Sequence, residues 1–473
     1  MTNWWSRIAQ RKTLAAVLAA GFALRLFFLL LPVSRDDDTA VYTELARNWF
    51  QRGVYGVTTA QGLRPTLIRL PGYPMFLGAV FAVFGQHRLW PGMVIQAVLD
   101  LAGCWLLYDV ARTEVSRRAG WAALLLAALC PFTAAYTAAG MTESLSISCV
   151  SLAVWSLART VRAAEAGNDP RWPLIALGGA MGYAILLRPD AVLLAAAFCA
   201  SLFWYARKSL GNGRALRLAA TAAALAALPL VPWTVRNLRT FHTFQPLAPR
   251  YANNPGEFVP LGFIRWMRTW SVDFVDAGTV FWNLDGQIDM DDIPLRACYT
   301  PAECRLTETL IGEHDQTDTV TPELDAKFGA LAGQRIREQP WNYYVRFPLE
   351  RVFAMWFWPR TELFNIEVHW WRVADHPAES AWAVALALVN LGYVGLAVVG
   401  FARRRVPFSA ALLGYVALRC ILLATVESPE QRYTMVMFPV LFLAGACALG
   451  KGDVAAERKE RRAEPEASPL ALQ

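Results

Sequence analysis

The chain has 473 residues, of which 55% are hydrophobic and only 18% are charged, and it contains 19 tryptophans. This balance is rare among soluble enzymes of this length and predicts a polytopic membrane protein. The net charge of +7 is modest and lies largely in short loops and in the C-terminal tail, so it does not indicate a nucleic-acid partner.

The apolar runs are long enough to cross a ~30 Å hydrocarbon layer, which requires about 17–25 residues. The first run, 14–33, follows Arg7, Arg11 and Lys12 and has no small-residue cleavage site after it, so we interpret it as a retained anchor helix. Further spans are expected at about 89–110, 119–138, 144–158, 172–187, 191–205, 216–235, 382–401, 407–426 and 433–450. The predicted fold is therefore all-α, with about ten or more transmembrane helices.

One shorter apolar segment, 71–85, decides on which side of the membrane each loop lies. It begins at Pro71 and is too short for a comfortable span, so we expect it to lie in the interface or to re-enter. The basic residues beside the other runs then all fall on the side of Arg11 and Lys12, as the positive-inside rule requires of the cytoplasm. The outer side receives the loop 34–88 and a large domain at 236–380.

The chain divides into four parts on this reading. An N-terminal transmembrane module at 1–235, with its first periplasmic loop at 34–88, precedes a periplasmic or interfacial domain of mixed helical and irregular structure at 236–380; C-terminal transmembrane helices at 381–450 and a disordered cytoplasmic tail at 451–473 follow. The outer domain is rich in tryptophan, so part of it is expected to lie at headgroup level.

Two cysteines of the outer domain differ from the six others, which lie inside apolar runs. Cys298 and Cys304 occur in the polar stretch "CYTPAEC". They predict a disulfide in an oxidising compartment more than a metal site, because two cysteines alone do not form a zinc site.

Carboxylates gather where the first run ends, in "SRDDDTAVYTELARNWF". Asp37 and Asp38 precede a stretch with helical spacing of apolar residues, so one reading is a capped helix start. Three adjacent negative charges at a lipid boundary favour a functional role as well, and the two readings are compatible. Glu143 stands at the start of another predicted span and is a second candidate, with capping by Thr142 as the alternative.

Arginines recur at the outer ends of the predicted segments, namely Arg69, Arg188, Arg236 and Arg432. Each alone is compatible with a side chain that reaches from the membrane to the interface. Together with the carboxylates they favour an anionic partner, because guanidinium groups suit phosphate oxygens. Arg25 lies inside the first run and requires a partner there.

The same stretches resemble a known superfamily. In order along the chain, "DDDTAVYTELARNWFQRGVYG", "RLPGYPMFLGAVFAVFG", "GMTESLSIS", "LLRPDA", "PWTVRN" and "RYTMVMFPVLFLAG" are similar to the C-type (GT-C) glycosyltransferases, which include the bacterial protein O-mannosyltransferases and the lipid A aminoarabinose transferase. The resemblance covers about residues 10–240 well and the last spans less well.

The resemblance implies roles for individual residues. Asp38, four residues before Tyr42, matches the catalytic carboxylate of the superfamily, with Asp37 as the second choice, and Glu143 matches its second acid. Arg69, four residues before Tyr73, matches the basic residue that contacts the donor phosphate. The chain departs from the aminoarabinose transferases by an arginine for their lysine here and by Gly72 for a second proline, which leaves the sugar and the acceptor open.

The function expected from these residues is transfer of a sugar from a polyprenyl-phosphate donor to a hydroxyl of a protein, lipid or glycan, with inversion, at the periplasmic face of the inner membrane. Arg188, Arg236 and Arg432 are expected to help Arg69 hold the phosphate. No cofactor is required, although a divalent metal is compatible with clustered carboxylates. The alternative is a transporter or flippase of an anionic lipid or solute, which would instead place polar groups near the midplane.

Overall fold

A computed structural model describes residues 2–31, 37–85, 88–284, 286–364, 366–367, 369–403 and 406–450, without the side chains of residues 2–10 and 37. The tail predicted to be disordered, 451–473, lies outside the described residues. The described chain is mostly helical and has one hairpin, in which β1 (Gly56–Thr59) pairs antiparallel with β2 (Gly62–Pro65).

Five helices are long and apolar enough to cross a membrane. They are α1 (Thr2–Leu30), α4 (Trp90–Glu114), α7 (Glu143–Glu165), α9 (Val192–Leu210) with the short turn Pro189–Ala191 before it, and α17 (Pro377–Arg403). A sixth candidate is the pair α10 (Asn212–Ala227) and α11 (Leu230–Phe241), which is bent by 45° at its break. The prediction of ten or more spans is therefore not confirmed by the described helices.

The remaining predicted spans form shorter or broken helices. Apolar but short are α8 (Arg171–Leu187), α18 (Ser409–Leu423) and α20 (Phe438–Leu449), which follows the one-turn α19 (Arg432–Met435). The run expected at 119–138 is split into α5 (Arg117–Ala128) and α6 (Pro131–Tyr136). The break falls at Pro131, because proline lacks the N–H that would continue the helix.

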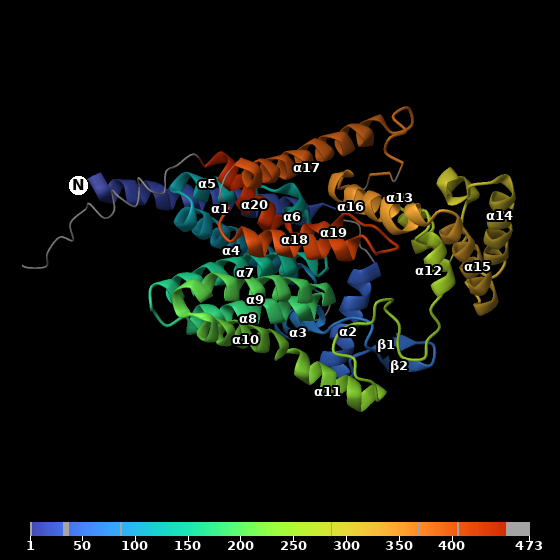
Figure 1. Cartoon of the computed structure of the whole chain (residues 1–473), viewed down its shortest axis with the longest axis horizontal. Coiled ribbons are helices and arrows are strands. Elements are labelled where there is room, and N and C mark those ends of the chain that lie inside the picture. The colour runs from blue at the N-terminus through green and yellow to red at the C-terminus, as the bar shows by residue number, and fades with distance from the viewer. Residues whose placement is uncertain are drawn as a thin grey trace, which may run out of the picture.

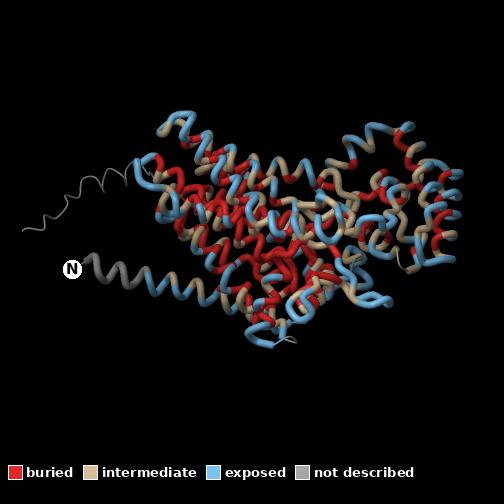
Figure 2. The backbone as a smooth tube through the Cα atoms, turned by 90° about the horizontal axis from the view of Figure 1, so that it is seen from below, coloured by how far each residue is buried: buried red, intermediate tan, exposed pale blue. Residues whose placement is uncertain are grey.

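The helices form an elongated bundle whose N-terminus lies at one end (Figure 1). The helices of the outer region lie at the opposite end, at the right of Figure 1, as does the hairpin. Buried residues concentrate inside the bundle, whereas α1 projects from it with largely exposed side chains (Figure 2). Exposed apolar side chains on such a helix are typical of contact with lipid.

The outer region has its own small core. It contains α12 (Leu261–Met267), α13 (Phe274–Thr279), α14 (Pro301–Asp315), α15 (Pro322–Glu338) and α16 (Phe347–Phe357). Its core is built around buried aromatic side chains, chiefly Phe263, Trp266, Trp270 and Phe328. These four side chains are fully enclosed, so Trp266 and Trp270 pack inside the region and are not among the tryptophans that could lie at headgroup level.

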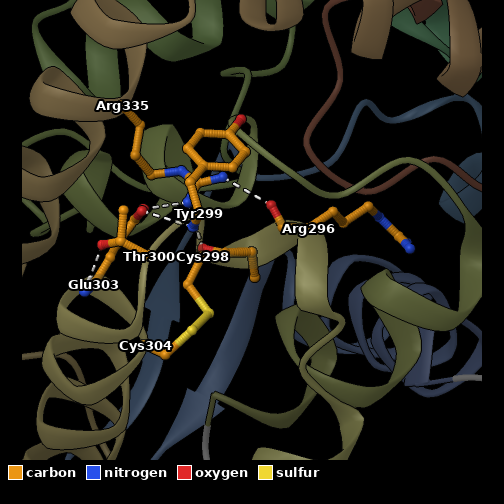
Figure 3. Close-up of a disulfide and its surroundings, with 8 residues drawn as sticks. Arg296, Cys298, Tyr299, Thr300, Glu303, Cys304 and Arg335 are labelled. Atoms are coloured by element: carbon orange, nitrogen blue, oxygen red, sulfur yellow. Dashed lines mark hydrogen bonds and ion pairs between the residues drawn. A yellow bond between two sulfur atoms is a disulfide. The ribbon is translucent and has the colours of Figure 1, made fainter.

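Cys298 and Cys304 form a disulfide at the start of α14 (Figure 3). Thr300 caps the same helix by accepting a hydrogen bond from the backbone N–H of Glu303 at 3.2 Å. The buried guanidinium of Arg335 pairs with Glu303 and stacks on the ring of Tyr299, 4.1 Å from its centroid. The disulfide thus closes the start of α14, beside the buried ion pair that links this helix to α15.

The segment 71–85, which we expected to lie in the interface or re-enter, forms the helix α3 (Gly72–Phe84). This helix packs against α4, α8 and α2 (Asp37–Arg52). Its first residue is in close contact with α8, because a Cβ added at Gly72 would lie 2.6 Å from the backbone carbonyl of Leu186. The hydroxyl of Tyr183 also donates to the carbonyl of Gly72 at 3.1 Å. Only glycine therefore fits where α3 begins.

Replacing Gly72 by alanine is expected to lower the free energy of unfolding by about 1–3 kcal/mol, because the new methyl group meets backbone that cannot rotate away. Gly179→Ala in α8 is the matched control, since nothing lies within 4 Å of a Cβ there. Thermal unfolding in detergent measures both. Equal melting temperatures for the two variants would contradict the close contact of α3 with α8.

Candidate active site

Asp38 lies in the first turn of α2, where two arginines that are far apart in the sequence hold its carboxylate. Arg69 Nη2 is 2.9 Å from Oδ1, and Arg432 Nη1 is 3.0 Å from Oδ2. Arg69 comes from the loop between β2 and α3, and Arg432 begins α19. Burial acts to raise the pKa of Asp38, but the two guanidinium groups outweigh it and lower that pKa. The group is therefore a charged carboxylate with both oxygens in ion pairs.

Glu143 forms a second ion pair at the start of α7. Arg188 Nη1, at the end of α8, lies 2.6 Å from Glu143 Oε1, and the hydroxyl of Thr142 lies 3.3 Å from Oε2. Thr142 makes no side-chain cap to α7, so the capping alternative is wrong. Arg188 also faces Asp190 at 3.5 Å, and Asp190 in turn pairs with Arg419 at 2.8 Å.

The two ion pairs meet at the turn before α19. Glu430 Oε2 lies 2.6 Å from Arg432 Nε, and the hydroxyl of Tyr433 donates to Glu430 Oε1 at 2.5 Å. The guanidinium groups of Arg188 and Arg432 each lie 5.6 Å from the centroid of the Tyr433 ring. We call the resulting set the charged cluster; it comprises Asp38, Arg69, Glu143, Arg188, Asp190, Arg419, Glu430, Arg432 and Tyr433.

Tyr42, one helical turn after Asp38 in α2, packs against Tyr73 of α3. Their rings meet edge to face with centroids 5.1 Å apart. The hydroxyl of Tyr73 donates to Gln96 Oε1 at 2.7 Å, and Gln96 donates to the backbone carbonyls of Thr137 and Ala139. Burial and the nearby Asp38 raise the pKa of Tyr42 to about 12. The pair therefore supports the start of α2 as two neutral, buried rings.

Arg236 is the predicted site residue that the structure does not bring to the charged cluster. Within the described part of the chain, its guanidinium donates to the backbone carbonyls of Thr66 and Tyr55, both at 2.7 Å, and contacts the rings of Tyr55 and Trp233. It also donates to Asn237 Oδ1 at 2.9 Å, and it ties α11 to the loop 34–88. The side chain of Asp37 lies outside the described residues.

The sequence reasoning missed Asp190, Arg419, Glu430 and Tyr433. The signal was present in part, since Asp190 and Glu430 lie in the outer turns "RPD" and "ESPEQR" beside arginines that we did select. Arg419 lies inside an apolar run and has only 1% of its surface exposed. A charged residue in such a run indicates a partner, but the sequence does not say which one.

The carboxylates of the charged cluster do not gather as a metal site. Over the described ranges, no group of three or more His, Cys, Asp or Glu side chains could hold a metal ion. Each of Asp38, Glu143, Asp190 and Glu430 faces a guanidinium instead. The charged cluster thus offers carboxylates that can act as a base, each next to the positive charge of an arginine.

Comparisons with known proteins agree on the fold. The family model of dolichyl-phosphate-mannose-protein mannosyltransferases matches residues 65–233. Of the solved structures, archaeal oligosaccharyltransferase AglB from Archaeoglobus fulgidus, in complex with an inhibitory peptide and a dolichol-phosphate, is 12% identical with a TM-score of 0.51, over 98% of this chain and 53% of that one. This chain therefore spans about half the length of AglB.

A second similar structure is ArnT from Cupriavidus metallidurans. Bound to undecaprenyl phosphate, it is 16% identical over 92% of this chain and 77% of that one, with a TM-score of 0.41. Its apo form is 17% identical over 94% and 78%, with a TM-score of 0.40. The search of curated proteins gave no match. The chain is a multi-pass membrane protein whose fold is similar to that of AglB, and its residues 65–233 are similar to the dolichyl-phosphate-mannose-protein mannosyltransferases.

Proposed function

We propose that the protein transfers a sugar from a polyprenyl-phosphate donor to a hydroxyl group of an acceptor. The observation that carries the proposal is the carboxylate of Asp38 between Arg69 and Arg432, with the ion pair of Glu143 and Arg188 beside it. A reaction of this class needs a base for the attacking hydroxyl and positive charge for the departing phosphate. The charged cluster provides both within one set of contacts.

Arg69 and Arg432 are the groups we assign to the donor phosphate. Both arginines pair with Asp38, and Arg432 pairs with Glu430 as well, so an incoming phosphate competes with Asp38 for the same guanidinium groups. When the phosphate takes one arginine, an oxygen of Asp38 is released from its ion pair. Donor binding thereby prepares the base, and Arg188 adds positive charge on the other side of Tyr433.

Asp38 then takes the proton of the acceptor hydroxyl in a single displacement. The acceptor oxygen forms a bond to the anomeric carbon, the bond from that carbon to the phosphate oxygen breaks, and polyprenyl phosphate leaves as an anion held by the arginines. Glu143 orients the acceptor or the sugar. Attack opposite to the leaving group inverts the anomeric centre.

We place the charged cluster at the periplasmic face of the inner membrane. The support is the positive-inside assignment of the loops together with the Cys298–Cys304 disulfide, a bond that persists in oxidising compartments. The region 236–380 would then be periplasmic. The short apolar helices α8, α18 and α20 would add to the span count, whereas α3 stays outside it, as the assignment of the loops requires. The acceptor is a protein, a lipid or a glycan.

The proposal is tested with purified protein in lipid vesicles. Undecaprenyl phosphate carrying a labelled hexose, N-acetylhexosamine or pentose is added with a membrane extract that contains protein, lipid and glycan acceptors. We expect release of sugar-free undecaprenyl phosphate and label in a larger product, with at least one of the sugars. Movement of the donor across the vesicle without product would contradict transfer and support the transporter alternative.

A further inference from the structure

Glu362 carries a carboxylate oxygen that accepts no hydrogen bond within the described part of the chain. The residue lies between α16 and α17, in a segment that enters the bundle, where its neighbours Arg360, Thr361 and Leu363 are buried. The hydroxyl of Tyr136 donates to Glu362 Oε1 at 3.0 Å. Oε2 is enclosed and accepts no hydrogen bond from any described residue. Such an oxygen costs free energy unless a ligand donates to it.

The nearest cation does not neutralise this carboxylate. The donors of Arg360 go instead to Asn390 Oδ1 at 2.9 Å, to the carbonyl of Gln431 at 2.9 Å and to Thr434 Oγ1 at 2.7 Å. Burial raises the pKa of Glu362, against the attraction of Arg360, and Glu430 adds to the rise. The group thus differs from Asp38 and Glu143, which are both held in ion pairs.

A second buried acceptor without a donor among the described residues lies in the turn before α19. Gln431 has 1% of its surface exposed, and among the described residues nothing donates to its Oε1. It stands between Glu430 and Arg432, and its backbone carbonyl accepts from Arg360, two residues from Glu362. Gln431 is thus the sequence neighbour of Arg432, which pairs with Asp38, and Arg360 links its backbone to the segment that carries Glu362.

The chemistry of these acceptors identifies the ligand class. The phosphate of the donor offers hydrogen-bond acceptors, and its isoprenoid chain offers no donor, so neither supplies the donors that these oxygens lack. Hydroxyl groups donate to carboxylate and amide oxygens alike, so a neutral sugar would satisfy both. We propose that Glu362 and Gln431 bind hydroxyl groups of the sugar on the donor and so determine which sugar is transferred. This inference rests on the proposed function of the charged cluster.

The test separates binding of the sugar from binding of the lipid phosphate. Kinetics are measured with the undecaprenyl-phosphate sugar that the wild type uses, and sugar-free undecaprenyl phosphate serves as inhibitor. For Glu362→Gln we expect KM for the donor to rise about tenfold, as loss of one hydrogen bond to a carboxyl group predicts, with kcat changed less. The inhibition constant of sugar-free undecaprenyl phosphate should stay the same, and Gln431→Met should raise KM in the same direction.

Two controls keep the result specific. Glu350→Gln removes an exposed carboxylate of α16 that pairs with Arg346, so it should change neither constant. Donors that each lack one sugar hydroxyl are compared next. For the donor that lacks the hydroxyl bound by Glu362, wild type and Glu362→Gln should have the same KM. Size-exclusion profiles and melting temperatures show whether each variant is folded.

Three outcomes would overturn the inference. An equal rise in KM and in the inhibition constant would mean that Glu362 only supports the site. A change confined to the KM of the acceptor would assign the pair to the acceptor, and unchanged kinetics would remove it from binding. A wild-type protein without any transfer would instead refute the proposed function, so the two failures are distinguishable.

Discussion

Asp38→Asn is expected to reduce the rate of sugar transfer by a factor of about 10²–10⁴, the usual contribution of a positioned general base. The amide keeps the shape of the side chain but cannot take a proton from the acceptor hydroxyl. Release of undecaprenyl phosphate from a labelled donor at saturating concentration measures the effect on kcat. Asp169→Asn, an exposed carboxylate paired with Arg171, is the matched control and should transfer at the wild-type rate.

Asp38→Asn should also change the binding of the lipid phosphate, because Asp38 pairs with two arginines. Asparagine removes the carboxylate charge that pairs with Arg69 and Arg432, so less negative charge competes with a phosphate for these guanidinium groups, although Arg432 keeps its ion pair with Glu430. Sugar-free undecaprenyl phosphate should therefore bind more tightly to Asp38→Asn than to the wild type. Lost transfer with weaker lipid binding would point to a misfolded site, and undiminished transfer would remove Asp38 from the mechanism.

Arg25→Leu is expected to destabilise the protein by roughly 3–5 kcal/mol, because it leaves the charge of Asp100 buried without a partner. Arg25 Nε lies 3.0 Å from Asp100 Oδ2, and Nη1 donates to the carbonyls of Gly21 and Ala128 at 2.8 and 2.7 Å. These contacts join α1, α4 and the end of α5. Thermal unfolding in detergent measures the loss.

The double variant Arg25→Leu/Asp100→Leu tests the cause. Removing both charges restores an apolar contact between α1 and α4, so the double variant should be more stable than Arg25→Leu alone. The difference, obtained as a double-mutant cycle, gives the coupling of the pair. A double variant that is less stable than either single variant would show that the hydrogen bonds of Arg25 to the backbone matter more than the ion pair.

The sequence by itself determined the long helices and the residue types of the site. Runs such as 14–33 and 382–401 are apolar over a span's length, and they appear in α1 and α17. The resemblance to the C-type glycosyltransferases implies roles for Asp38, Glu143 and Arg69. Arg188, Arg236 and Arg432 were expected at the site because charge at the end of an apolar run is costly. Local composition carries this information, so no knowledge of the neighbours was necessary.

Only the tertiary structure decided which charges meet. Asp38 and Arg432 are 394 residues apart, and nothing in either local pattern selects that partner over Arg236. Arg236 instead meets two backbone carbonyls, while Asp190, Glu430 and Arg419 complete the charged cluster. Tertiary packing likewise decided the surroundings of Glu362. Tyr136 of α6 donates to one of its oxygens, and the other is buried without a donor among the described residues. Ion pairing acts over a few ångströms, so its outcome depends on packing between distant segments, which local sequence does not encode.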